Sequence, residues 1–171
     1  GLGPDDHTRL YFPGDQHQMR AVVQRVFSDS GLRFVFSPRS ALPDILGDDG
    51  QPLYGAGYRF EPGLDHVVRE GSAGWVISYG DVLHLALDAV MELRVSGLDV
   101  GLINKSTLNQ VDEESLARVG KSGFVLVAES QNINTGLGND TVYVQKVTGG
   151  LGVFSSDGQD TAIVGLNGSV Q

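Results

Sequence analysis

Residues able to do chemistry are few and widely spread in this sequence. It contains no cysteine, which excludes disulfides, thiolate metal sites and cysteine catalysis. The four histidines show no spacing typical of a metal site; they are His7, His17, His66 and His84. The basic residues are scattered, with no cluster denser than the segment Arg33 to Arg39. We therefore expect at most a local site for a phosphate-sized anion.

A second place for chemistry is the turn Ser78-Tyr79-Gly80-Asp81. It ends an apolar segment that we predict to be a parallel strand, and α/β folds bind ligands at the carboxyl ends of such strands. Asp81 is also suited to cap the following helix, which is the simpler interpretation. Two glycine-rich segments, 136–138 and 149–152, are predicted to be turns, because neither completes a phosphate-binding Gly-x-Gly-x-x-Gly pattern.

The elements that must position these residues begin with a strand, a helix and a strand over about residues 8–46. Leu10-Tyr11-Phe12 is a short apolar strand, and Asp15 stands where a helix N-cap belongs. Apolar residues then follow at helical spacing until Gly31. Leu32 to Ser37 is rich in aromatic and β-branched residues, which suits a buried strand. The segment is predicted to be one βαβ unit.

The stretch 74–138 alternates apolar strands with helical segments, which predicts an α/β domain with a parallel, doubly wound sheet. We expect its strands near 74–78, 98–104 and 123–129 and a helix capped by Asp112. The last strand is nearly continuously apolar, as in a buried parallel sheet. Residues 47–73 are rich in glycine and proline and are predicted to be a linker. Thr141 to Val147 and Thr161 to Leu166 alternate like strands, so the tail is predicted to be β-rich.

Composition excludes several classes of protein. Hydrophobic residues make up 40% and charged residues 19%, and no apolar run approaches a membrane span, so we expect a folded protein without a membrane partner. The net charge is −9, which disfavours binding to nucleic acid. Gly1 to Asp6 lacks the basic and apolar regions of a signal peptide, so a cytoplasmic location is expected.

The order of the elements resembles the transketolase family of thiamine diphosphate enzymes, from the end of the pyrimidine-binding domain into the C-terminal domain. The similar motifs cover roughly residues 8–138: Leu10-Tyr11-Phe12-Pro13-Gly14-Asp15, the Arg-x-x-Leu-Pro turn Arg39 to Pro43, the strand and turn Gly74 to Asp81, the helix start Val111-Asp112-Glu113-Glu114, and Val127-Ala128-Glu129 followed by Thr135-Gly136-Leu137-Gly138. The resemblance implies a partial pyrimidine-binding domain at 1–46, a linker at 47–73, and a three-layer C-terminal-like domain at 74–171 whose residues 139–171 diverge.

The family's activity is transfer of a ketol fragment between sugar phosphates through thiamine diphosphate and Mg²⁺. By resemblance, Asp15 contacts hydroxyls of the sugar and Arg39 binds its phosphate. Both roles suit the residue types, since a carboxylate accepts hydroxyl hydrogen bonds and a guanidinium group can bind phosphate through two of them. Both have simpler alternatives: Asp15 as a helix N-cap, and Arg39 as a solvated loop cation.

Much of the family's machinery lacks a counterpart. Gly47-Asp48-Asp49-Gly50 resembles the Gly-Asp-Gly segment that holds Mg²⁺ and diphosphate, but it lies in a turn-rich stretch with no Asn in register, so an exposed turn is favoured. The family's cofactor-activating glutamate belongs upstream of Leu10. We therefore expect the chain alone to bind no cofactor and to be inactive, and we expect the remainder of the enzyme, on the same or a separate chain, as its partner in a dimer or other homo-oligomer.

Two other functions stay open at this point. The β subunit of a 2-oxo acid dehydrogenase shares the Ser-Tyr-Gly turn, although Arg39 argues against it because 2-oxo acids carry no phosphate. The other is a non-catalytic, transketolase-like module for assembly or effector binding, which the tail after Gly138 favours.

Overall fold

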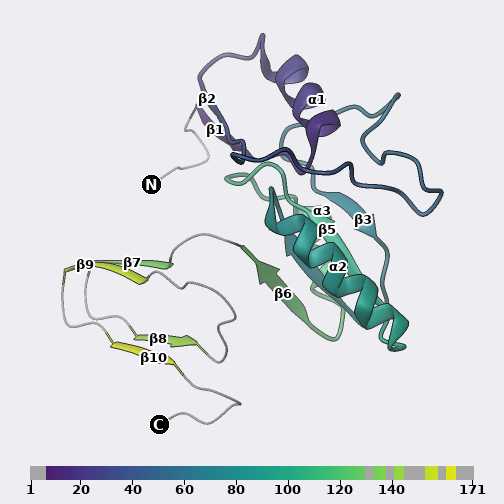
Figure 1. Ribbon diagram of the computed structural model, residues 1–171. Coiled ribbons are helices and arrows are strands. Elements are labelled where there is room, and N and C mark those ends of the chain that lie inside the picture. Colours follow the sequence, from purple (N-terminus) through teal and green to yellow (C-terminus); the bar gives the residue numbers. More distant parts are fainter. Residues whose placement is uncertain (1–6, 130–132, 138–140, 145–152, 158–160, 165–171) are drawn as a thin grey trace. The chain divides into compact units, whose positions relative to one another are not determined.

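The computed structural model describes residues 7–129, 133–137, 141–144, 153–157 and 161–164 (Figure 1). The chain divides into two compact units, Gly1–Glu129 and Ser130–Gln171. No helix in the described residues is long and apolar enough to cross a membrane.

The predicted βαβ unit is confirmed. Strand β1 (Thr8–Tyr11) leads into helix α1 (Gln16–Val26) and strand β2 (Leu32–Val35), and β2 pairs in parallel with β1. One face of this two-stranded sheet packs on α1 and forms a small hydrophobic core. The buried residues of this core are Tyr11, Val22, Val26 and Phe60. The outer edge of β1 is covered by the chain after β5, because Phe12 N–H donates to the Ser106 carbonyl at 2.9 Å and Leu108 N–H to the Leu10 carbonyl at 2.8 Å.

The larger sheet has four strands in the order β3-β5-β4-β6, with β4, β5 and β6 parallel and β3 antiparallel at one edge (Figure 1). Its elements are β3 (His66–Arg69), β4 (Gly74–Ser78), α2 (Val82–Val95), β5 (Val100–Asn104), α3 (Glu113–Val119) and β6 (Val125–Ala128). Asp112 caps α3 as predicted, since its Oδ1 accepts the Ser115 N–H at 3.0 Å.

Alternate residues of the parallel strands face different helices. Val76 and Leu102 share a buried cluster with Leu83 and Val90 of α2. Trp75 and Ile103, on the opposite side, share another with Val119 of α3. A strand presents successive side chains to opposite faces, so the two helices cover the two sides of the sheet. The predicted three-layer, doubly wound α/β architecture is confirmed.

Three strand predictions need correction. Strand β2 is predicted to be buried, but Leu32 and Phe34, and Phe36 just after the strand, are exposed, because β1 is its only partner among the described strands. Strand β3 lies within the range 47–73, which is predicted to be a linker without clear elements. With only four residues, this strand is too short for an alternation of apolar and polar residues to be recognised. Strand β6 is predicted to be buried but is half exposed, because β4 is its only partner among the described strands. The division at 1–46, 47–73 and 74–171 stays a prediction.

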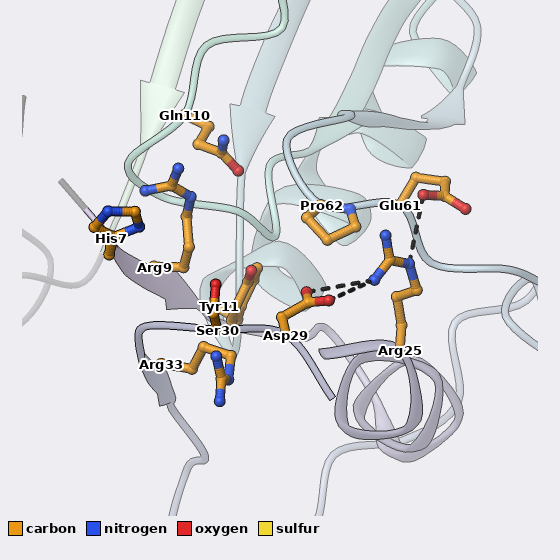
Figure 2. A pocket seen from close by; sticks show the side chains of 10 residues that line it. All are labelled: His7, Arg9, Tyr11, Arg25, Asp29, Ser30, Arg33, Glu61, Pro62 and Gln110. Atoms are coloured by element: carbon orange, nitrogen blue, oxygen red, sulfur yellow. Dashed lines mark hydrogen bonds and ion pairs between the residues drawn. The ribbon is translucent and has the colours of Figure 1, made fainter. Parts of the chain in front are cut away.

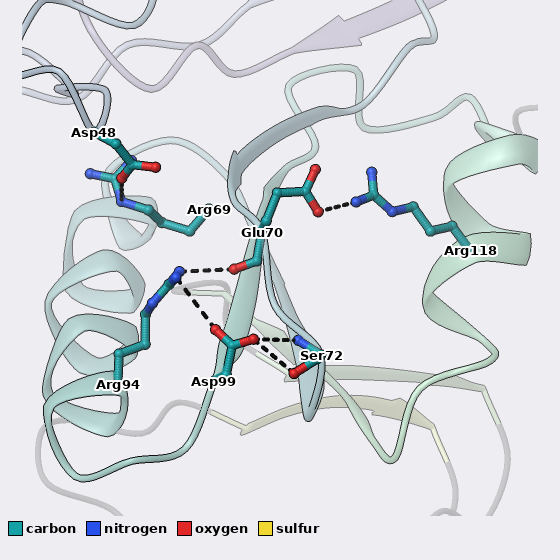
Figure 3. A network of polar contacts seen from close by, with 7 residues as sticks. All are labelled: Asp48, Arg69, Glu70, Ser72, Arg94, Asp99 and Arg118. Carbon is teal, nitrogen blue, oxygen red and sulfur yellow. Dashed lines mark hydrogen bonds and ion pairs between the residues drawn. The ribbon is translucent and has the colours of Figure 1, made fainter.

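A polar network ties β3 to both helices near the start of the parallel strands (Figure 3). Arg94 of α2 donates to the Glu70 carbonyl at 2.8 Å and lies 3.4 Å from the Asp99 carboxylate. On the other side, Arg118 of α3 pairs with the Glu70 carboxylate and lies 4.8 Å from the centre of the Trp75 ring. These contacts fix the antiparallel edge strand on the sheet.

The second unit consists of two parallel strand pairs. Strand β7 (Ile133–Leu137) pairs with β9 (Val153–Asp157), and β8 (Thr141–Val144) pairs with β10 (Thr161–Val164). In β8 and β10 the partners lie twenty positions apart, as Thr141 with Thr161; in β7 and β9 this holds for Ile133 with Val153, but the register shifts at Gly136. The β-rich tail is confirmed. The turn predicted at 136–138 is wrong for Gly136 and Leu137, which belong to β7, and the turn predicted at 149–152 lies outside the described residues.

Candidate functional site

A crevice of about 260 Å³ opens at the carboxyl ends of β1 and β2. Pro13 and Asp15 line it from the β1–α1 connection and Met19 from α1, and Pro38, Ser40 and Leu42 line it from the loop after β2. The carboxyl ends of parallel strands are where α/β folds place ligands. The sequence motifs around Asp15 and Arg39 therefore meet at one crevice, although the two side chains are presented differently.

Asp15 is buried, with 3% of its surface exposed, and both of its carboxylate oxygens accept backbone hydrogen bonds. Oδ1 accepts the Gln18 N–H at 2.8 Å, which caps α1, and Oδ2 accepts the Ile45 N–H at 3.0 Å. The second bond joins the start of α1 to the end of the 37–45 loop. Asp15 therefore shapes the crevice by holding its two walls together.

Arg39 lies exposed in the loop after β2. Its two sequence neighbours, Pro38 and Ser40, both line the crevice. Within the part of the chain that the structure describes, its guanidinium group has no ion-pair partner. An arginine in this state is available to bind an anion at low cost, because no existing pair must be broken.

A buried hydrogen-bond network beneath the crevice was missed by the sequence analysis. Gln18 is fully buried, and its Oε1 accepts the Gly14 N–H at 2.7 Å and the Asn104 Nδ2 at 2.9 Å. Asn104 ends strand β5 and also donates to the Tyr54 hydroxyl at 2.8 Å. A glutamine three residues after an N-cap is a capping-box signal, which points to a helix start but not to a link with a second sheet.

Close packing at Gly14 completes the link. A methyl group added at Gly14 would stand 2.7 Å from Leu83 Cδ2 and 2.9 Å from Ile45 Cδ1, so a larger residue there would displace the ends of these two side chains. The Gly14 carbonyl also lies 2.7 Å from His84 Nε2 on α2. The β1–α1 turn is therefore seated on α2 and β5, and its position relative to them is fixed.

The turn Ser78–Asp81 is a second place predicted from the sequence. Asp81 Oδ1 accepts the Val82 N–H at 3.1 Å, so it caps α2, as the simpler interpretation expects. The Tyr79 hydroxyl donates to Glu129 at 2.7 Å, and burial together with that carboxylate raises the pKa of Tyr79. A mostly apolar pocket of about 190 Å³ adjoins Tyr79, with the Lys105–Asp65 ion pair, 3.1 Å long, among its lining.

The segment Gly47–Gly50 does not fit a diphosphate and magnesium site. It forms a turn closed by the Gly47 N–H, which donates to the Gln51 carbonyl at 2.8 Å. The Asp48 carboxylate points to Arg69, with 3.4 Å between the paired atoms, and Asp49 accepts the Gln51 N–H at 3.0 Å. Both carboxylates are therefore engaged in local contacts, as expected for an exposed turn.

Comparisons with known proteins find transketolases and also the β subunit of the pyruvate dehydrogenase E1 component of Bacillus subtilis, which is 29% identical over 86 residues, covering 50% of this chain and 26% of that relative. The family model described as "Transketolase, C-terminal domain" matches residues 65–146. The chain is 31% identical over 128 residues to a putative uncharacterized transketolase family protein of Sinorhizobium fredii, covering 74% of this chain and 35% of the relative. It is 25% identical over 132 residues to an apulose-4-phosphate transketolase subunit of Actinobacillus succinogenes, covering 77% and 40%.

A solved structure shares the fold as well. It is described as a split gene transketolase, inactive beta4 tetramer, and it matches with a TM-score of 0.66 and 25% sequence identity. The match covers 74% of this chain and 40% of that one. The chain thus spans less than half the length of these relatives.

Replacing Asp15 by Asn should destabilise the protein, because the amide keeps one acceptor oxygen and sets an NH₂ group against a buried backbone N–H. We expect a loss of about 1 to 3 kcal/mol in the free energy of unfolding, measured by urea denaturation. Asp81→Asn is the matched control, since Asp81 caps α2 through one bond only, and it should cost no more than about 1 kcal/mol. Equally small effects of the two changes would contradict the structural role of Asp15.

Proposed function

We propose that this chain, which contains a transketolase-family C-terminal domain, is the C-terminal part of a transketolase-like enzyme whose other domains complete it. In this assembly the chain supplies substrate contacts and an assembly surface, and the reaction transfers a ketol fragment between sugar phosphates. The proposal rests above all on the incomplete state of the β1–β2 sheet.

One face of that sheet is left open. Leu32, Phe34 and Phe36 alternate along β2 and its extension, and they are 56%, 45% and 41% exposed. The outer edge of β2 has no partner strand among the described residues, whereas β1 is covered on both sides. A two-stranded sheet is marginal by itself, and an exposed apolar edge favours pairing with further strands. The remaining strands of a pyrimidine-binding domain would fit at this edge and face.

The assignment of Arg39 to a substrate phosphate is part of the proposal. It is supported by its exposure beside the crevice and by its available guanidinium group. That Asp15 contacts a sugar hydroxyl stays a prediction, and the backbone bonds to both of its oxygens favour a positioning role. The sugar would then be held by Arg39 in a crevice whose shape Asp15 maintains.

Thiamine diphosphate carries the ketol fragment in the complete enzymes of this family. The Gly47–Gly50 turn does not fit its diphosphate, so we assign no step of the reaction to that segment. The groups that hold the cofactor are proposed to come from the remainder of the enzyme, on the same or a separate chain.

The purified chain should therefore bind no thiamine diphosphate when it is titrated with the cofactor and Mg²⁺ by calorimetry. The native mass of the same sample should exceed that of one chain, because the exposed β2 face should associate with a second copy. Phe34→Ser should lower this native mass, because the apolar contact is lost. Saturable, tight binding of the cofactor by the chain alone would refute the proposal that other domains are needed.

In the assembled active enzyme, Arg39→Ala should lower kcat/KM for a phosphorylated sugar by roughly 10- to 100-fold, the usual loss when hydrogen bonds to a charged group are removed. The same change should leave an unphosphorylated sugar nearly unaffected. Arg20→Ala, which removes an exposed arginine of α1, is the control for total charge. Equal losses for both sugars would remove Arg39 from the phosphate role.

A further inference from the structure

A second cavity, of about 350 Å³, lies at the opposite ends of the same two strands (Figure 2). It is polar, and its lining includes His7 and Arg9 from the start of β1, Arg33 from β2, and Arg25 from α1. The crevice beside Arg39 lies at the carboxyl ends of β1 and β2, whereas this cavity lies toward their amino ends. It is therefore a separate place on the molecule.

Two arginines are set side by side in this cavity. Arg9 and Arg33 are register partners in the parallel β1–β2 pair, so their side chains leave the sheet on the same face. The Nη1 of Arg33 is buried and has no hydrogen-bond partner in the described structure. A buried donor of this kind costs free energy until an acceptor reaches it.

The carboxylates of the cavity lie toward α1. Arg25 pairs there with Asp29 at 3.0 Å and lies 3.6 Å from the Glu61 carboxylate (Figure 2). The cavity therefore has an arginine-rich side at β1 and β2 and an acidic side at α1. A ligand with one anionic group and a neutral, hydroxyl-bearing remainder suits this distribution, whereas one with anionic groups at both ends is repelled by Asp29 and Glu61.

A neutral hydrogen-bond acceptor, Gln110, also favours a ligand that carries hydroxyl groups. Gln110 lines the cavity from the loop after β5, and its buried Oε1 has no hydrogen-bond donor in the described structure. The Tyr11 side chain lines the same cavity, and its hydroxyl is close enough to feel the charges of four residues: Arg9, Arg25, Arg33 and Asp29. A hydroxyl-bearing ligand can donate to Gln110 and to the carboxylates while its anionic group accepts from the arginines.

We propose that this cavity is a binding site for a phosphate monoester of a small polyhydroxylated molecule, distinct from the proposed substrate crevice. The phosphate lies against Arg9 and Arg33, and the hydroxyl groups face Asp29, Glu61 and Gln110. Binding satisfies the buried Arg33 donor, so the ligand also stabilises the β1–β2 sheet.

The test uses the full chain and calorimetric titration at low ionic strength with ribose 5-phosphate, inorganic phosphate and ribose as probes. Ribose 5-phosphate should bind most tightly, inorganic phosphate more weakly, and ribose least. Arg33→Gln should weaken ribose 5-phosphate by about ten-fold or more, the usual cost of losing a charge-assisted hydrogen bond. Arg33→Lys keeps the charge but not the planar fork, and should give an intermediate affinity.

Two control variants separate this site from the alternatives, and each variant is first shown to be folded by thermal denaturation. Arg39→Gln should leave unchanged the part of the ribose 5-phosphate binding that Arg33→Gln removes, and Arg20→Gln, which lies on α1 outside the cavity, should leave the affinity unchanged. The proposal is overturned if wild-type protein does not bind ribose 5-phosphate in the millimolar range, or if Arg39→Gln alone abolishes binding. It is also overturned if Arg20→Gln weakens binding as much as Arg33→Gln, because the attraction would then be non-specific. None of these outcomes depends on the activity of the assembled enzyme.

Discussion

The hydrogen bond between Gln18 and Asn104 is the interaction on which the rest of the first unit depends. It joins the first turn of α1 to the end of β5, and it is buried on both sides, so its loss would leave polar atoms without partners in the interior. The same Gln18 oxygen holds the Gly14 N–H, and Gly14 is packed against Leu83 and Ile45. The βαβ unit is thus kept in place by a sheet to which it contributes no strand.

This constraint explains how one small unit can present two different cavities. With the β1–α1 turn fixed on α2, the carboxyl ends of β1 and β2 open toward the loop that carries Arg39. The amino ends of the same strands gather Arg9 and Arg33 on the α1 side of the sheet. The opposite face of that sheet, with Phe34 and Phe36, stays uncovered and provides the proposed attachment surface.

The sequence predicted the elements that have strong local signals. Asp15, Asp81 and Asp112 were recognised as caps, and each accepts a backbone N–H at a helix start. Strand β3 was missed because it is short and antiparallel, and its place at the edge is set by tertiary contacts. The pairing of Arg9 with Arg33 could not be predicted either, since it depends on strand register, which no spacing in the sequence reveals. The Gln18 network joins residues far apart in the chain and leaves only a capping signal at one end.

Native-state hydrogen exchange is the most direct test of the claim that the βαβ unit and the four-stranded sheet form one cooperative structure. The account predicts that backbone amides at Val22 in α1 and Leu102 in β5 open with the same free energy, and that Gln18→Leu lowers the value for Val22 well below that for Leu102. If Val22 already exchanges far faster than Leu102 in the wild-type protein, the buried link does not hold the two parts together and the central claim is contradicted.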